Sequence, residues 1–224
     1  MEVKKLHEWD ISYKEARTLQ ERLASKIRLT SVRKKPKLIA GIDCAFSKNG
    51  KRIGVAVIVM DYPELTVIET KTATGDVTYP YIPGLLSFRE APVCLAAVEK
   101  LEHTPDLFLV DGQGIAHHRK LGLAAHLGLF FDKPTIGCAK SRLVGEFEEP
   151  AAEKGSFSPL TYKDEQVGAV VRTRTNVKPL FISVGNRCDL DFAIEWTLNC
   201  AIKYRLPEPT RLAHKAVTKL KPNI

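Results

Sequence analysis

Three acidic side chains stand at positions where the sequence predicts a buried or ligand-facing residue. Asp43 interrupts the apolar run 38–42, and Asp111 ends the apolar run 107–110 just before Gly112. Charged residues are seldom found inside apolar strands unless something there needs them. Strand ends followed by glycine are where α/β sheets present their ligand-binding groups. Both aspartates are therefore candidate site residues.

The third acid, Glu90, falls on the face of a predicted helix that should be buried. Counting back from Leu101 at helical spacing through Ala97, the apolar stripe reaches Glu90. Pro92 removes a backbone hydrogen bond from that stretch, so either the helix begins near Ala91 or it bends at the proline. Both arrangements place Glu90 close to the mouth of a site.

These three carboxylates suit metal chemistry if the elements that carry them are neighbours. Taken singly, each acid is better explained as a helix cap or an ion-pair partner, and only the three together favour a metal site. Carboxylates a few ångströms apart raise one another's pKa, so a converging cluster stays ionised only with cations nearby. Oxygen ligands of this kind select Mg²⁺ or Mn²⁺. Such an ion activates water and stabilises charge on a phosphate, which is how metal-dependent nucleases work.

The elements that must position these acids alternate between strand-like and helix-like patterns. An amphipathic helix follows Ser12, which forms a capping box with Glu15, and the basic stretch 33–37 ends it. Three strand-like runs follow, at 38–46, 53–61 and 65–72, the first two joined by the tight-turn signal Asn49-Gly50. The rest predicts helices at 91–101, 119–131, 190–203 and 210–220, and strands at 107–110, 134–139, 167–172 and 180–184. This order predicts an α/β fold with a mixed sheet.

Composition and length indicate a globular protein. The chain has 224 residues, of which 44% are hydrophobic, so we expect one domain over residues 1–224. The five cysteines are scattered without a C-x-x-C pair, which predicts neither a disulfide framework nor a zinc site. The N-terminus does not resemble a signal peptide, and no apolar run approaches the length of a membrane span. We expect a cytoplasmic monomer.

The net charge of +8 is unevenly distributed along the chain. Residues 1–40 carry eleven Lys or Arg against five Asp or Glu, and residues 201–224 carry six against one. The middle of the chain is therefore net acidic. Basic ends around an acidic centre suit a surface that binds nucleic acid and holds a carboxylate pocket, although many globular proteins are mildly basic without such a role.

Five segments, in order along the chain, resemble the endonuclease V family. They are Gly41-Ile42-Asp43, Pro80-Tyr81-Ile82-Pro83-Gly84-Leu85-Leu86-Ser87-Phe88-Arg89-Glu90, Asp111-Gly112-Gln113-Gly114-Ile115-Ala116-His117 continuing through Arg119-Lys120-Leu121-Gly122, Pro134-Thr135-Ile136-Gly137-Cys138-Ala139-Lys140-Ser141, and Glu208-Pro209-Thr210-Arg211-Leu212-Ala213-His214. The resemblance implies a ribonuclease-H-like fold, with a mixed central sheet flanked by helices. It also implies a DNA repair endonuclease that cuts the second phosphodiester bond 3′ to deoxyinosine and leaves a 3′-hydroxyl and a 5′-phosphate.

The same resemblance implies roles for particular residues. Asp43, Glu90 and Asp111 would hold Mg²⁺, for which Mn²⁺ would substitute. His117 and Lys140 would lie at the scissile phosphate and act in catalysis. His214 would be a further catalytic neighbour, but helical spacing places it away from the buried face of the last helix. A surface histidine that contacts phosphate and one that contacts nothing both fit that position.

Two further groups of residues would bind the substrate. Pro80, Tyr81, Ile82 and Pro83 would form a wedge that enters the DNA where the damaged base leaves the stack, because the prolines stiffen the segment and Tyr81 offers a flat face. The alternative explanation is that this segment is only an exposed proline turn, without a role in binding. A base pocket would form around Gly84, Leu86, Gly112 and Gly122, where the backbone can approach a flipped hypoxanthine closely.

The sequence departs from the family pattern at two positions, and three other functions are alternatives to the one that the resemblance implies. His118 stands where the family usually has proline, and Ala125 where it usually has serine. An inosine-directed ribonuclease would use the same chemistry, because a pocket that reads the base does not decide the sugar. A different nuclease on the same fold and a nucleic-acid-binding protein without activity are further alternatives, which the wedge motif and the intact acids respectively disfavour.

Overall fold

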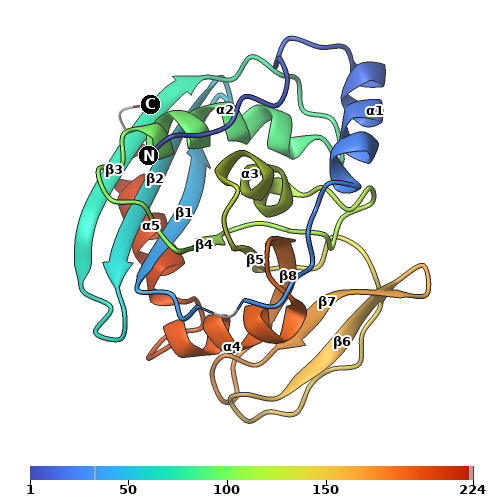
Figure 1. Ribbon diagram of the computed structural model, residues 1–224, viewed down its shortest axis with the longest axis vertical. Helices are drawn as coiled ribbons and strands as arrows, with labels where there is room; N and C mark the ends of the chain where they lie inside the picture. The colour runs from blue at the N-terminus through green and yellow to red at the C-terminus, as the bar shows by residue number, and fades with distance from the viewer. Residues whose placement is uncertain (33, 222–223) are drawn as a thin grey trace.

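The computed structural model describes residues 1–32, 34–221 and 224 (Figure 1). Arg33, the first residue of the predicted basic stretch, lies outside the described residues, as do Pro222 and Asn223. Among the described residues, no helix is long and apolar enough to cross a membrane. All five cysteines are free thiols.

An eight-stranded mixed sheet forms the centre of the molecule, in the order β3-β2-β1-β4-β5-β8-β7-β6. Its strands are β1 Leu38–Phe46, β2 Arg52–Asp61, β3 Val67–Asp76, β4 Leu107–Val110, β5 Thr135–Ala139, β6 Phe157–Tyr162, β7 Glu165–Val171 and β8 Leu180–Asn186. The central strands β1, β4 and β5 are parallel, and all other neighbouring pairs are antiparallel. The mixed sheet predicted from the element order is confirmed.

Helices cover both faces of this sheet (Figure 1). They are α1 Tyr13–Ala24, α2 Leu86–Glu99, α3 Leu123–Phe131, α4 Leu190–Cys200 and α5 Glu208–Leu220. Side chains alternate across β1, so Ala40 and Ile42 pack with α2 and α3, whereas Ile39 packs in the core that includes α4. Helix α5 lies against β1 and β2. Helix α1 packs outside α2 and α3 through Leu19 and Leu23.

Two helices begin four or more residues away from their predicted starts. Helix α2 begins at Leu86 and continues through Pro92, so the predicted start near Ala91 is wrong. Helix α3 begins at Leu123 instead of Arg119. The residues before it form a turn, in which the N–H of Lys120 bonds to the carbonyl oxygen of His117 at 2.9 Å and Lys120 has a positive φ of 53°. That conformation is incompatible with a helix.

The strand predictions hold with shifted ends and one omission. The three-strand meander at the start of the sheet is confirmed, with β3 running on to Asp76 instead of ending at Thr72. The pair β7 and β8 is also confirmed. Strand β6 had no recognisable pattern, because it lies at the sheet edge, contains Pro159 and buries only Leu160 fully. Edge strands tolerate proline because one side of their backbone is unpaired.

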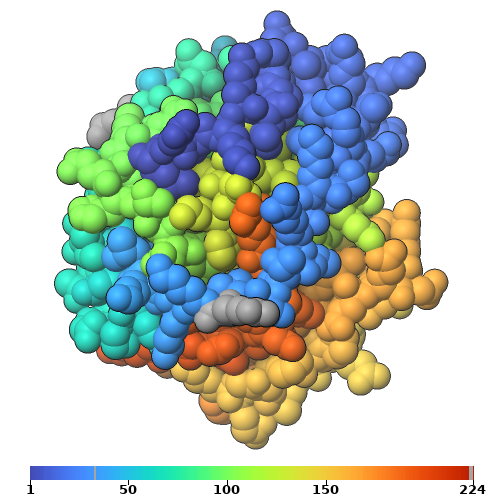
Figure 2. Space-filling view, viewed as in Figure 1, coloured from blue at the N-terminus to red at the C-terminus, as the bar shows by residue number. Residues whose placement is uncertain are grey.

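The N-terminal stretch before α1 packs on the outer surface of α2 and α3 (Figure 2). The backbone N–H of Lys4 bonds to the carbonyl oxygen of Phe130 at 2.9 Å. The Trp9 ring stacks on Phe130 with ring centroids 5.5 Å apart. His7 reaches the buried His126, with their Nε2 atoms 2.8 Å apart. Part of the basic N-terminal region is thus built into the fold.

Candidate active site

Strand register places Asp43 and Asp111 next to each other. In the parallel pair β1–β4, Ile42 lies opposite Val110, so the residue that follows each of them emerges at the same edge of the sheet. The backbone N–H of Asp111 bonds to the carbonyl oxygen of Ile42 at 3.0 Å, which continues the ladder to this point. The two carboxylates predicted from interrupted apolar runs are therefore brought together by two neighbouring central strands.

Helix α5 adds a third group, His214. Its Nδ1 lies 2.7 Å from Oδ2 of Asp43, while Oδ1 of Asp43 accepts the N–H of Cys44 at 2.8 Å. The helix can come this close because Gly41 has no side chain: a Cβ there would lie 2.1 Å from the carbonyl carbon of Pro209. The alternative in which His214 contacts nothing is wrong. About half of its side chain is covered, and its ring hydrogen-bonds to the carboxylate of Asp43.

Asp43, Asp111 and His214 lie close enough together to hold a metal ion. Each offers one ligand atom, and these three atoms all lie within 4.8 Å of one another. Oxygen and imidazole nitrogen donors at such spacing could hold a divalent cation. We call these residues the acid–histidine cluster.

Glu90 faces this cluster from the second turn of α2. Its carboxyl is buried, and burial, followed by the negative charges of Asp43 and Asp111, raises its pKa to about 8. Glu90 thus lies near enough to feel both charges, although it is not among the three residues whose ligand atoms converge. Its place among the metal ligands stays a prediction.

The carboxylates of Asp43 and Asp111 repel each other, and neighbouring groups offset part of that repulsion. Burial raises the pKa of Asp43 and the Asp111 charge raises it further, while the His214 hydrogen bond and Lys140 lower it. Lys140, which directly follows β5, forms an ion pair from Nζ to Oδ2 of Asp111. Its side chain is 38% exposed, so the ammonium stands between the buried acid and solvent. A bound cation would relieve the repulsion that remains.

His117 lies deeper than a phosphate-contacting residue at the surface would. Its side chain is buried, and burial, followed by the charges of Arg119 and His118, lowers its pKa to about 4. The imidazole is therefore neutral at pH 7. Its Nδ1 accepts the backbone N–H of Arg119 at 3.2 Å. The predicted contact of His117 with the scissile phosphate is not tested by this geometry.

The predicted wedge lies on the surface between β3 and α2. Pro80, Tyr81 and Pro83 are exposed, Ile82 is half-buried, and the Tyr81 side chain is 69% exposed. The guanidinium of Arg89 lies 5.6 Å from the centre of the Tyr81 ring. An exposed aromatic ring beside a cation suits contact with a base and its phosphate.

The four residues predicted for the base pocket lie at three places around the loop that follows β4. Gly112 follows Asp111, and Gly122 caps α3, with its N–H bonded to the carbonyl oxygen of Gly114 at 2.9 Å. Gly84 ends the wedge with a positive φ of 79°, and its carbonyl oxygen accepts Nη2 of Arg119 at 2.9 Å. Leu86 is 42% exposed. The wedge and the loop therefore meet at Gly84.

The two departures from the family pattern sit in different surroundings. His118 is exposed, with its ring edge toward Tyr162 at a centroid distance of 6.2 Å. Ala125 is fully buried on α3, packed among the residues beneath α1. Neither residue belongs to the acid–histidine cluster.

Two polar side chains near the site had no predicted role. Gln20 of α1 is completely buried and bonds to both Arg119 and Gly84. Its signal in the sequence was a glutamine within the apolar stripe of the first helix, four residues after Ala16. Arg119 stood inside a recognised motif, but nothing in the sequence indicated where its guanidinium points.

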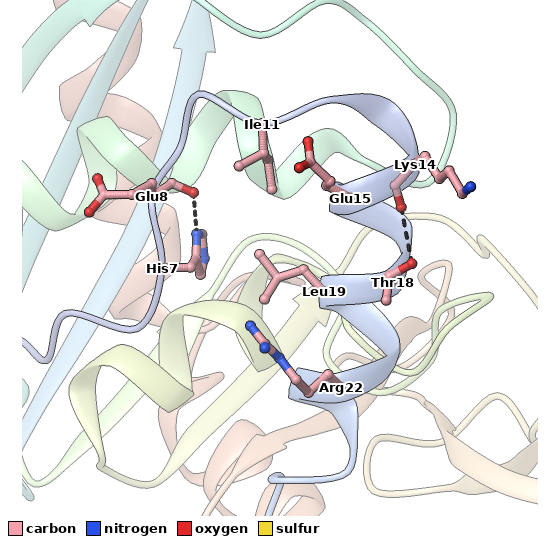
Figure 3. Close-up of a pocket in the computed structure, with 8 residues that line it drawn as sticks. All are labelled: His7, Glu8, Ile11, Lys14, Glu15, Thr18, Leu19 and Arg22. Carbon is pink, nitrogen blue, oxygen red and sulfur yellow. Dashed lines mark hydrogen bonds between the residues drawn. The ribbon is translucent and has the colours of Figure 1, made fainter.

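A separate cavity of about 540 Å³ lies between α1 and the N-terminal stretch. Figure 3 shows Leu19 and Arg22 reaching from α1 toward His7 and Ile11 across this cavity. None of its lining residues belongs to the acid–histidine cluster, the wedge or the loop after β4.

Comparison with known proteins shows to which family this chain belongs. A model of the endonuclease V family matches residues 21–215. The chain belongs to the endonuclease V family. An endonuclease V from Dehalococcoides mccartyi is 50% identical over 220 residues, which cover 98% of this chain and 99% of the relative. Because members of this family are nucleases, the chain is an endonuclease, and its acid–histidine cluster could bind a metal ion.

Solved structures of family members share the whole fold. Endonuclease V from Streptomyces avermitilis has a TM-score of 0.92 at 39% identity, covering 100% of this chain and 99% of that one. Endonuclease V from Ciona intestinalis, in complex with a 24mer DNA containing an inosine followed by a ribo-adenosine, has a TM-score of 0.80 at 28% identity. That match covers 94% of this chain and 98% of the other. The predicted α/β, ribonuclease-H-like fold is confirmed.

Proposed function

We propose that this endonuclease recognises deoxyinosine in DNA and hydrolyses the second phosphodiester bond on its 3′ side. The products are a 3′-hydroxyl and a 5′-phosphate. The observation that carries the proposal is the acid–histidine cluster of Asp43, Asp111 and His214, in which the ligand atoms lie within 4.8 Å of one another, set in a chain of this family. The Ciona relative, bound to DNA containing an inosine, supports the choice of lesion.

We propose Mg²⁺ as the cofactor. Asp43, Asp111 and His214 would hold it, with Glu90 completing the carboxylate shell from α2. The donor set fits, since the carboxylate oxygens suit both Mg²⁺ and Mn²⁺, and Mn²⁺ would substitute. A divalent cation held by these residues would supply Lewis-acid chemistry, polarising the phosphate and lowering the pKa of a water molecule.

Lys140, His214 and His117 would supply the remaining functions of the site. Lys140 carries an ammonium beside Asp111, from which it can donate to an oxygen of the attacked phosphate and stabilise the charge that develops there. His214 fixes the orientation of the Asp43 carboxylate through its hydrogen bond. His117, neutral at pH 7, would meet the phosphate through a single ring N–H and without a positive charge.

The wedge and the base pocket would supply recognition. Tyr81 would stack in the gap left by the extruded base, because its exposed ring needs no partner from the protein. Main-chain groups at Gly84, Gly112 and Gly122, beside Leu86, would read the O6 atom and the protonated N1 that distinguish hypoxanthine from adenine. In this proposal residues 1–224 act as one domain and as a monomer on the nucleic acid.

A second candidate function is an inosine-directed ribonuclease. It is favoured by the strand in the Ciona complex, in which a ribo-adenosine follows the inosine. Four oligonucleotides of one sequence, DNA or RNA and with or without inosine, separate the two functions when incubated with enzyme and Mg²⁺. We expect the inosine DNA to be cut fastest. Faster cutting of inosine RNA would establish the second function, and equal cutting of all four would refute both.

A further inference from the structure

Helix α1 sends one polar side chain into the protein interior. Gln20 is fully buried and lies on the same face as Ala16, Leu19 and Leu23, which pack on α2 and α3. Burying an amide is costly unless each of its polar atoms finds a partner. The N-terminal end of the helix is fixed by the capping box of Ser12 and Glu15.

The partners of Gln20 come from two segments that are far apart in the sequence. Its Nε2 donates to the carbonyl oxygen of Gly84 at 3.0 Å and to that of Leu121 at 3.3 Å. Its Oε1 accepts Nε of Arg119 at 2.5 Å. Carbonyl oxygens only accept and a guanidinium only donates, so these partners fix the orientation of the amide. Every polar atom of the side chain is used.

Arg119 bonds to Gly84 as well as to Gln20. Its Nη2 donates to the carbonyl oxygen of Gly84 at 2.9 Å, and its backbone N–H donates to His117. A side chain at Gly84 would displace the Arg119 guanidinium, because a Cβ there would lie 2.7 Å from Nη2 of Arg119. Gly84, the residue directly after the wedge, thus receives two donors, one from Gln20 and one from Arg119.

We propose that Gln20 and Arg119 are positioning residues that fix the wedge, residues 80–83, relative to the loop 117–122, and thereby set the selectivity for inosine. This inference rests on the proposed function. The wedge fills the gap and the loop surrounds the extruded base, so both must act on one nucleotide step at once. Neither Gln20 nor Arg119 belongs to the acid–histidine cluster, and Arg119 bonds to His117 through its backbone N–H, which remains when the side chain is replaced. The two side chains therefore contribute to recognition and not to hydrolysis.

Gln20→Leu and Arg119→Lys test the proposal. Leucine keeps most of the buried volume and removes all three hydrogen bonds of the amide, and lysine keeps the charge of Arg119 but loses its two-pronged contact. Single-turnover cleavage is measured against enzyme concentration on duplexes with and without one deoxyinosine. We expect the half-saturating concentration on the inosine duplex to rise about tenfold, since a shift of about 1 Å in a positioning group has effects of that order or larger.

The split between binding and turnover distinguishes positioning from damage to the site. The maximal rate at saturating enzyme should stay within about threefold, because the acid–histidine cluster is untouched. Gln20→Glu keeps an acceptor for Arg119 but loses the donors to Gly84 and Leu121, so its half-saturating concentration should lie between those of wild type and Gln20→Leu. Wild-type values in folded Gln20→Leu and Arg119→Lys would overturn the proposal, as would a loss confined to the maximal rate.

Asn186→Leu is the matched control. Asn186 is another buried amide, which donates to the carbonyl oxygen of Gly128 at 2.9 Å and accepts the N–H of Arg28 at 3.0 Å. It touches neither the wedge nor the loop, so its replacement should lower the melting temperature without moving the half-saturating concentration. An equal shift in this variant would show that general destabilisation explains the effect.

A hydrogen-exchange measurement separates this inference from the proposed function. If the wild type cuts both duplexes equally, the proposed function fails and selectivity no longer reports on positioning. In that case faster exchange at both 81–85 and 117–122 in Gln20→Leu, absent in Asn186→Leu, supports the joint positioning of the two segments. Unchanged exchange at either segment refutes it.

Discussion

Asp43 is contacted both by its own strand, β1, and by helix α5. Its two carboxylate oxygens are engaged by His214 and by the N–H of Cys44, and the Asp111 charge raises its pKa. Asn at this position keeps the shape and removes the negative charge. We expect Asp43→Asn to reduce cleavage by about a hundredfold or more, as the loss of electrostatic stabilisation at a reacting centre does.

Binding provides the control for this variant. Removing an acid takes away no basic contact, so affinity for an inosine duplex in a gel-shift assay should remain within a few-fold of wild type. Cleavage close to the wild-type rate would show that Asp43 is not a metal ligand.

His214 should affect the response to metal more than the binding of DNA. We expect His214→Ala to raise the Mn²⁺ concentration needed for half-maximal cleavage by about 10- to 100-fold, as the loss of groups that orient metal ligands does. Thr218→Ala, one turn further along α5, is the matched control. An unchanged metal response in His214→Ala would place the imidazole outside the metal site.

At the residue scale, the sequence predicted what depends on local pattern. Asp43 and Asp111 were found because each breaks an apolar run, and the strand register explains why both breaks occur at one edge. The contact between His214 and Asp43 spans 171 residues, and nothing in the periodicity of the last helix encodes it. The partners of Gln20 were hidden for the same reason.

The wedge can be tested as an element separate from the fold. Because the Tyr81 side chain is largely exposed, Tyr81→Ala should leave the melting temperature unchanged. Affinity for an inosine duplex should fall about tenfold or more, since stacking of one base on an aromatic ring contributes about 1–3 kcal/mol. Binding is measured by fluorescence anisotropy with the active site intact.

Phe157→Ala supplies the comparison for the wedge variant. Phe157 is also exposed, but it lies on the edge strand β6. Its removal should leave DNA affinity unchanged. Equal affinities of wild type and Tyr81→Ala would refute the wedge.

Elements were predictable where pattern and turn chemistry agree. The meander β1–β3 followed from β-branched runs and the Asn49-Gly50 turn. The start of α3 was misplaced because Arg119–Leu121 have helical propensity, whereas tertiary contacts of Arg119 and the left-handed Lys120 hold them in a turn. Tertiary contacts override propensity in such short segments.

The stability of the whole molecule should depend on one buried acid far from the site. Burial opposes ionisation of Glu69, but the backbone N–H groups of Glu102 and His103, with the His103 ring and Lys71, lower its pKa to about 2. Its folded pKa lies below the unfolded value of 4.5, so its stabilising effect is complete above about pH 4.5 and is lost as the pH falls toward 2.

Glu69→Gln tests this dependence. We expect the variant to lower the free energy of unfolding at pH 7 by about 1.5–3 kcal/mol, the range for hydrogen bonds to charged groups. The deficit should shrink by more than half at pH 3. Urea unfolding at both pH values measures it, and a deficit that is equal at pH 7 and pH 3 would contradict the charge-based account.

At the scale of the molecule, element order was enough to predict an α/β fold with a mixed sheet. The assignment of helices to the two faces was not, because it depends on crossovers that the sequence does not encode locally. The N-terminal stretch illustrates a second limit: its basic residues suggested a surface role, but His7 and Trp9 anchor it to α2 and α3.

Mapping the cut on two matched DNA duplexes, which differ only by one deoxyinosine, tests the central claim most directly. With Mg²⁺, the account predicts a single nick in the inosine duplex, at the second phosphodiester bond on the 3′ side. It also predicts no nick with a chelator present or with Asp43→Asn. Equal cutting of both duplexes, or cutting that persists without a divalent metal, would contradict the account.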